Sequence, residues 1–120
     1  MEQDKLDLIF KNQKILQERL AFSKIVTDSD QQAYINQMIL ACMEEVVEIM
    51  RCTKYKNPEV VKFGWKKTQE DDFEHMKEEI VDLMHFVVNL SLAIGMTSKE
   101  FFEIYCRKNK LNHTRQDRDY

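Results

Sequence analysis

The stretch MILACMEEVVEIM, from Met38 to Met50, decides the fold of this chain. Its apolar residues occupy nearly every side of a helical wheel, which is typical of a helix buried among other helices. Three glutamates, Glu44, Glu45 and Glu48, nevertheless stand within it. A buried carboxylate costs several kcal/mol unless it has a partner. The stretch therefore predicts a packed helix whose acidic residues have something to bind.

A second stretch, residues 76–94, also combines an apolar seam with acids. Glu79 and Asp82 are three residues apart, as Glu45 and Glu48 are, so each pair lies on one helical face. Two such helices packed antiparallel, about 8–10 Å apart, would bring four carboxylates together. These charges would repel unless cations lay between them, and oxygen ligands favour Mg²⁺ or Mn²⁺ over zinc. The plainer alternative is a solvated acidic stripe, which fits poorly with the apolar neighbours.

Composition supports an all-α fold for the whole chain. The 120 residues suffice for one domain, residues 1–120, with little room for a second. Only two glycines and one proline occur, where average usage predicts roughly 14. This scarcity of turn-forming residues argues strongly against a many-stranded sandwich or barrel. We therefore predict a helical bundle of four main helices.

The boundaries of these helices follow from apolar spacing and capping signals. Ser29 to Gln32 and Thr97 to Glu100 have the pattern of capping boxes, and Gly95 is suited to end a helix. A basic loop containing Pro58 covers 56–68, and a flexible tail without apolar period covers 108–120. The predicted helices are residues 2–26, 29–55, 69–94 and 97–107.

Charge and cysteine usage limit the partners and the compartment. The net charge of −3 argues against a general nucleic-acid partner, although residues 107–120 are basic. The N-terminus lacks the pattern of a signal peptide, and polar residues interrupt the most apolar stretch, 80–96, so no membrane span is expected. Three cysteines without a CxxC pair favour reduced thiols in the core. We expect a cytoplasmic protein.

Four short motifs are spread along the chain. They are Gln13 to Gln17 (QKILQ), the acid pairs EVVE and EIVD, Phe63 to Lys66 (FGWK), and Lys108 to Tyr120 (KNKLNHTRQDRDY). The acid pairs resemble the ExxE…ExxD signature of the all-α nucleoside triphosphate pyrophosphatases, the MazG-like superfamily. The end of the chain resembles the KNxxNxxRQDxGY motif of the dimeric dUTPase family. The other two motifs are similar to that family's first motif and to its Trp-Lys loop.

This resemblance implies a dUTP diphosphatase. The reaction would be Mg²⁺-dependent, with Mn²⁺ as a possible substitute: a metal-activated water attacks the α-phosphorus of dUTP and releases dUMP and pyrophosphate. Glu45 and Glu48 would be catalytic, with Glu48 as the base. The expected metal ligands are Glu45, Glu48, Glu79 and Asp82. A homodimer is expected, both from the family and because the central helices are apolar over too much of their circumference for a small monomer to cover.

The remaining motif residues are assigned to the substrate. The C-terminal motif 108–120 would clamp the phosphates, the plain alternative being a disordered basic end. Amide side chains and aromatic rings would read and stack on the base, although core packing explains an aromatic residue equally well. The phosphate-binding candidates are Lys66, Lys108, Asn112, Arg115 and Tyr120. The base-binding candidates are Gln13, Gln17, Trp65, His85, Phe86 and Asn89.

Three other functions stay open. A relative of the same superfamily could act on dCTP or on a broader range of deoxynucleoside triphosphates. A di-iron helical bundle is suggested by Asp82-x-x-His85, but it would need a second such step, and iron content would reveal it. A non-catalytic helical interaction module would show no change in thermal stability with Mg²⁺.

Overall fold

All elements that the structure describes are helical. The computed structural model describes residues 4–54 and 70–118. The order along the chain is α1 (Lys5–Leu20), the short 3₁₀ turn η1 (Phe22–Lys24), α2 (Asp28–Met50), α4 (Phe73–Ala93) and α5 (Ser98–Asp117). The prediction of an all-α protein with four main helices is confirmed.

Helix α2 begins earlier than its sequence signal predicted. Its N-cap is Thr27, whose hydroxyl oxygen accepts a hydrogen bond from the backbone N–H of Asp30 at 3.1 Å. The Asp30 carboxylate accepts in return from the N–H of Thr27 at 3.0 Å and of Val26 at 3.1 Å, and these bonds lower its pKa. The predicted box starting at Ser29 was wrong because an aspartate here fills the position usually held by Glu or Gln.

Helix α5 is the largest departure from the prediction. Its start is confirmed: Gly95 has a φ of +79°, and Thr97 and Glu100 form a reciprocal capping box. The helix then continues to Asp117, so the flexible tail predicted for 108–120 was wrong as far as that residue. After Gly95 the sequence has no Gly or Pro to stop a helix, and its Arg, Lys, Leu and Gln residues are good helix formers.

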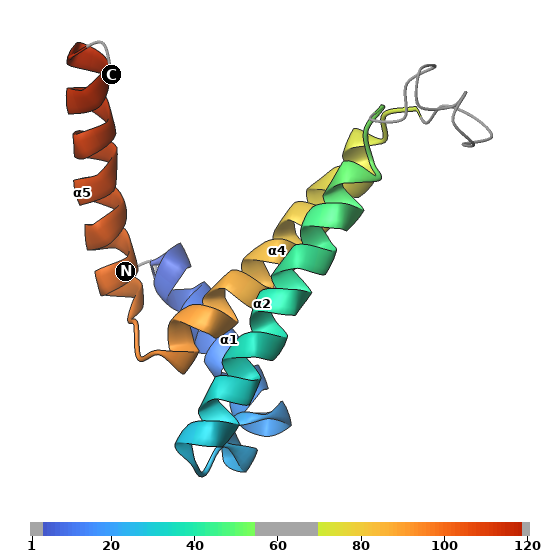
Figure 1. Ribbon diagram of the computed structural model, residues 1–120, viewed down its shortest axis with the longest axis vertical. Helices are drawn as coiled ribbons and strands as arrows, with labels where there is room; N and C mark the ends of the chain where they lie inside the picture. The colour runs from blue at the N-terminus through green and yellow to red at the C-terminus, as the bar shows by residue number, and fades with distance from the viewer. Residues whose placement is uncertain (1–3, 55–69, 119–120) are drawn as a thin grey trace.

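The helices form two diverging arms (Figure 1). Helices α2 and α4 run side by side and antiparallel, and α1 crosses this pair near its lower end. Helix α5 leaves in another direction and is attached to α1 at its first turn, where Phe101 meets Phe10 edge to face at 5.7 Å and Ser98 donates a hydrogen bond to Asp7. Cys106 on this arm is exposed, contrary to its expected place in the core.

Among residues 4–54 and 70–118, the buried core is small and unusually polar. Its apolar members are Phe10, Tyr34, Cys52 and Val88, and its polar members are Gln13, Gln17, Asn89 and Ser91. Buried amides are tolerated where they have hydrogen-bond partners or a ligand to bind. The position of these amides between α1, α2 and α4 therefore marks a candidate binding region.

A single copy leaves much apolar surface uncovered. Its accessible area is 9684 Å², whereas a compact monomer of this mass would expose about 6,800 Å². Its radius of gyration is 18.7 Å, against about 14 Å for a compact domain of this length. Large apolar side chains are exposed along α2, among them Leu40, Met43 and Val46. Such faces are typical of surfaces that pack against another chain.

The sequence predicted no membrane span in its most apolar stretch, which lies mostly in α4. Within residues 4–54 and 70–118, no single helix is both long and apolar enough to cross a membrane. Helices α4 and α5 pass together by length and composition, as a pair bent by 107°.

Candidate active site

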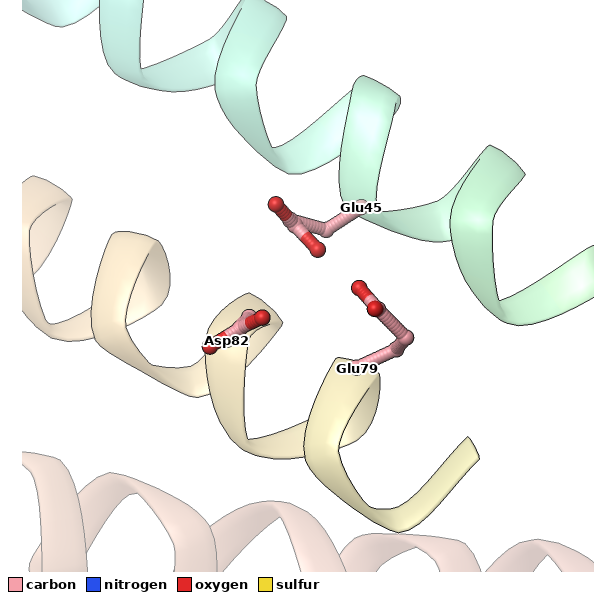
Figure 2. A group of neighbouring side chains, drawn as sticks. All are labelled: Glu45, Glu79 and Asp82. Atoms are coloured by element: carbon pink, nitrogen blue, oxygen red, sulfur yellow. The ribbon is translucent and has the colours of Figure 1, made fainter. Parts of the chain in front are cut away.

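Three of the four predicted carboxylates meet between α2 and α4 (Figure 2). Glu45 extends from α2 toward Glu79 and Asp82, which lie one turn apart on α4. One oxygen atom from each of the three groups lies within 4.8 Å of the others. The antiparallel packing of α2 and α4 therefore brings carboxylates together, as predicted. We call Glu45, Glu79 and Asp82 the carboxylate cluster.

The cluster perturbs its own ionisation. Burial raises the pKa of Glu45 to about 7, and a hydrogen bond with Glu79 and the negative charges of Glu79, Asp82 and Glu48 act in the same direction. The pKa of Glu79 is lowered, chiefly by a hydrogen bond with His75, whose Nε2 lies 2.8 Å from Glu79 Oε1. The pKa of Glu45 therefore lies near neutral pH, chiefly because its carboxyl group is buried.

The residues of the cluster fit a divalent cation. Glu45 Oε2 is a buried oxygen atom that has no hydrogen-bond partner among the described residues. Such an atom normally costs free energy, and a hard cation would compensate it. Three carboxylates converging on one point form an oxygen-only ligand set of the kind that suits Mg²⁺ or Mn²⁺.

Glu48 stands apart from the cluster. Its Oε1 accepts a hydrogen bond from Arg51 Nη1 at 3.2 Å, and its side chain is 45% exposed. It lines a surface groove of about 490 Å³ on α2 together with Val47 and Arg51. Glu45 and Glu48 were predicted to point to the same site from one helical face. Only Glu45 belongs to the cluster, and Glu48 lies one turn beyond it.

The raised pKa of Glu45 predicts a pH-dependent stability in the absence of divalent cations. Below about pH 4.5, the carboxyl group is protonated in both states and carries no penalty. Between about pH 4.5 and 7, the unfolded chain releases the proton while the folded chain retains it, so the free energy of unfolding falls as pH rises. We expect the melting temperature of wild type to fall across this window relative to Glu45→Gln, measured in EDTA at constant ionic strength. Parallel curves for the two proteins would contradict the shift.

A cavity of about 640 Å³ is lined by residues of α1, α2 and α4. This volume is within the usual range for small-ligand sites. Three predicted base-binding residues, Gln17, Phe86 and Asn89, line it together with Tyr34 and Met38. The other residues around it are Leu20, Ala21, Lys24, Ile25, Asp30, Ala33 and Gln37.

Buried amides give this cavity its polar character. Gln13 Nε2 donates to Asn89 Oδ1 at 2.9 Å, and the Tyr34 hydroxyl donates to Gln17 Oε1 at 2.7 Å. The Asn89 amide nitrogen faces the weakly accepting sulfur of Met38 at 3.5 Å. Asn89 is 2% exposed. The donor of this buried amide is therefore paired with a weak acceptor, and a carbonyl oxygen would be a stronger one.

The cavity and the cluster lie along the same helices. On α4, Asp82, Phe86 and Asn89 follow at steps of four and three residues and share one face. On α2, Met38 and Glu45 are seven residues apart, which corresponds to about 10 Å along the axis. The cavity and the carboxylate cluster are thus lined by side chains of the same two helices.

Tyr34 was missed in the sequence reading. Burial raises its pKa to about 12, its ring packs edge to face on Phe22 at 5.4 Å, and its hydroxyl fixes the Gln17 amide. The available signal was its position, one turn before Met38 on the face of α2 that carries Glu45.

Of the other predicted site residues, His85 lies beside the cluster and the rest lie elsewhere. His85 is exposed, with Nδ1 3.8 Å from Asp82 Oδ1. Lys108, Asn112 and Arg115 share one face of α5 by their spacing, but in the same chain α5 diverges from the arm that carries the cluster (Figure 1). The predicted residues Trp65, Lys66 and Tyr120 lie outside the described residues.

Comparisons with known proteins point to one family. A sequence profile described as dUTPase matches residues 5–103. The chain is 47% identical over 51 residues to a dCTP pyrophosphatase of Enterobacteria phage T4 and 45% identical over 51 residues to that of phage LZ5. Each match covers 42% of this chain and 29% of the relative, so the chain aligns with less than a third of their length. A DNA replication protein of phage T4 is 46% identical over 41 residues, 34% of this chain and 10% of that protein. No solved structure matches significantly.

Proposed function

The chain belongs to the dUTPase family, and on that premise we propose that it hydrolyses a pyrimidine deoxynucleoside triphosphate, with dUTP as the first candidate, to the monophosphate and pyrophosphate. The observation that carries this proposal is the carboxylate cluster, in which acids from two helices converge around an uncompensated buried oxygen atom. A solvated acidic stripe would not bring these side chains together.

The cluster would hold the divalent cation that this chemistry requires. Glu45, Glu79 and Asp82 are the proposed ligands for Mg²⁺ or Mn²⁺. The cation, when bound, neutralises phosphate charge and lowers the pKa of water. Glu48 is our candidate for accepting the proton of the attacking water, since its charge already influences Glu45 from one turn away. Its hydrogen bond with Arg51 would hold the carboxylate in position.

The cavity would select the base. Uracil and cytosine share the O2 carbonyl, and uracil adds a second carbonyl acceptor at O4 where cytosine has an amino group. Asn89 offers a donor toward the cavity, and Phe86 offers a ring for stacking. The amide oxygen of Gln17 accepts a hydrogen bond from the Tyr34 hydroxyl, which fixes the orientation of this amide. These groups suit a pyrimidine. dCTP is the second candidate because the two phage relatives are dCTP pyrophosphatases.

We also propose that the active form is a homodimer. The excess of accessible area over a compact monomer and the exposed apolar side chains of α2 support this proposal. Val47 and Met43 line the groove beside Glu48. A second copy packed there would also shield this part of α2 from water.

A deoxynucleotide panel tests the proposed function. The protein is assayed with dUTP, dCTP, dTTP and dATP, each with Mg²⁺, with Mn²⁺ and with EDTA. We expect release of pyrophosphate and a monophosphate from dUTP or dCTP, and loss of turnover in EDTA. Release of orthophosphate, equal activity in EDTA, or no turnover of any pyrimidine nucleotide would refute the proposal.

A further inference from the structure

His75 lies in the first turn of α4, one helical turn before Glu79. Its Nε2 is 2.8 Å from Glu79 Oε1, which joins it to a member of the carboxylate cluster. The His75 side chain is 53% exposed and that of Glu79 only 15% exposed. The imidazole is thus the outer partner of a carboxylate that points inward toward Glu45 (Figure 2).

The backbone that carries His75 is anchored to the end of α2. The Asp72 side chain caps α4 by accepting a hydrogen bond from the backbone N–H of His75 at 3.1 Å. The backbone N–H of Asp72 in turn donates to the carbonyl oxygen of Cys52, just beyond α2, at 2.8 Å. His75 is therefore held at a fixed place relative to the helix that carries Glu45.

Glu79 needs such a partner because of its neighbours. Oxygen atoms of Glu45, Glu79 and Asp82 lie within 4.8 Å of one another, a distance at which carboxylate charges repel. A glutamate side chain has several rotamers, so an unrestrained Glu79 would turn away from the other acids toward water. The hydrogen bond with His75 opposes this movement. It also lowers the pKa of Glu79, which favours the ionised form that a cation binds.

We propose that His75 is a positioning residue for the cation site: its imidazole holds the Glu79 carboxylate in the orientation that binds the divalent cation. This inference rests on the proposed function, because it places a cation at the carboxylate cluster. Groups that hydrogen-bond to metal ligands fix the orientation of those ligands. His75 acts through Glu79 and touches neither the cation nor the substrate, so its removal weakens cation binding and leaves the ligands themselves in the chain.

Manganese binding tests this role without any turnover. Free Mn²⁺ has an electron paramagnetic resonance signal that is lost on binding, so titration of the nucleotide-free protein gives a Kd. We expect His75→Ala to raise this Kd about 10- to 100-fold. His75→Gln keeps an N–H donor that can reach a side chain one turn along the helix, and it should recover most of the lost affinity. A wild-type Kd for His75→Ala, or equal Kd values for the two variants, would overturn the proposal.

Lys77→Gln is the matched control. Lys77 forms an ion pair of 2.8 Å with Glu74 on the same part of α4, and both side chains are exposed. Exposed ion pairs contribute little to stability, so Lys77→Gln and His75→Ala should both melt within about 5 °C of wild type in EDTA. Only His75→Ala should lose affinity for Mn²⁺. An equal loss in both variants, or a much lower melting temperature of His75→Ala, would replace the positioning role by a general effect of charge or of folding.

The dependence of turnover on Mg²⁺ separates His75 from Glu79. For His75→Ala, the Mg²⁺ concentration that gives half-maximal turnover should rise about 10- to 100-fold, and the rate at saturating Mg²⁺ should return toward that of wild type. Glu79→Gln lacks a ligand and should stay slow at every Mg²⁺ concentration. A His75→Ala protein that stays equally slow at saturating Mg²⁺ would overturn the positioning role.

The role of His75 and the proposed function fail in different ways. A wild-type protein that binds no Mn²⁺ and ignores Mg²⁺ in turnover would refute the proposed function itself. Binding of Mn²⁺ by wild type that is lost in Glu79→Gln but unchanged in His75→Ala would leave that function standing and overturn only the role of His75.

Discussion

Replacing Glu79 by glutamine is expected to lower kcat about 100- to 1000-fold, the usual effect of removing one group that stabilises charge in a transition state. Glutamine keeps the size of the side chain but removes a charge from the cluster. The hydrogen bond with His75 that it also weakens is exposed and contributes little to folding. The free energy of unfolding without divalent cation should therefore change by less than about 1 kcal/mol.

Two measurements separate this effect from general damage. Thermal melting of wild type should shift upward with Mg²⁺ or Mn²⁺, and Glu79→Gln should lose most of this shift. Glu78→Gln is the matched control, since Glu78 is the neighbouring acid on α4, is exposed and lies outside the cluster. A Glu79→Gln protein that is active and still stabilised by the cation would remove Glu79 from the proposed site.

The sequence was sufficient to predict the cluster because the relevant geometry is helical. The spacing of three residues between Glu79 and Asp82 places both on one face of any regular helix. It was not sufficient to predict how far each helix rotates about its axis, because the packing of α2 against α4 decides that rotation. Glu45 therefore reaches the cluster, whereas Glu48, one turn later, turns toward Arg51.

The extent of α5 was harder to predict for a related reason. The segment after Arg107 has no continuous apolar stripe, and such segments are often disordered in isolation. Its helical state depends on the weaker signals of residue propensity and the absence of stop residues. The motif in residues 108–117 was therefore recognisable from its residue types, whereas its helical conformation was not.

For the buried amides, the helical face could be predicted from the sequence, but the hydrogen-bond partner could not. Gln13 and Gln17 are four residues apart on one helical face, and Asn89 lies seven residues after Asp82, so their faces were predictable. Their partners were not, since the Gln13–Asn89 bond joins α1 to α4 across 76 residues of sequence. Tyr34 was overlooked because a tyrosine within an apolar helix is usually a packing residue.

Replacing Asn89 by leucine is expected to lower kcat/KM for the proposed pyrimidine nucleotide about 100-fold or more. Leucine fills a similar volume but removes the amide donor of Asn89. A site that hydrogen-bonds its substrate loses a large factor in kcat/KM when that bond is absent. The substitution also leaves Gln13 Nε2 without its acceptor, which should destabilise the fold by about 1–3 kcal/mol.

A second substitution separates recognition from folding. In Asn89→Leu combined with Gln13→Leu, both partners of the buried hydrogen bond are replaced by apolar groups, and such a replacement can be nearly neutral for stability. We expect the melting temperature to return toward wild type while kcat/KM stays low. Asn36→Leu, an exposed amide on α2, is the control for adding an apolar side chain. If activity returned together with stability, Asn89 would be a packing residue, and base selection would have to depend on Gln17 and Phe86.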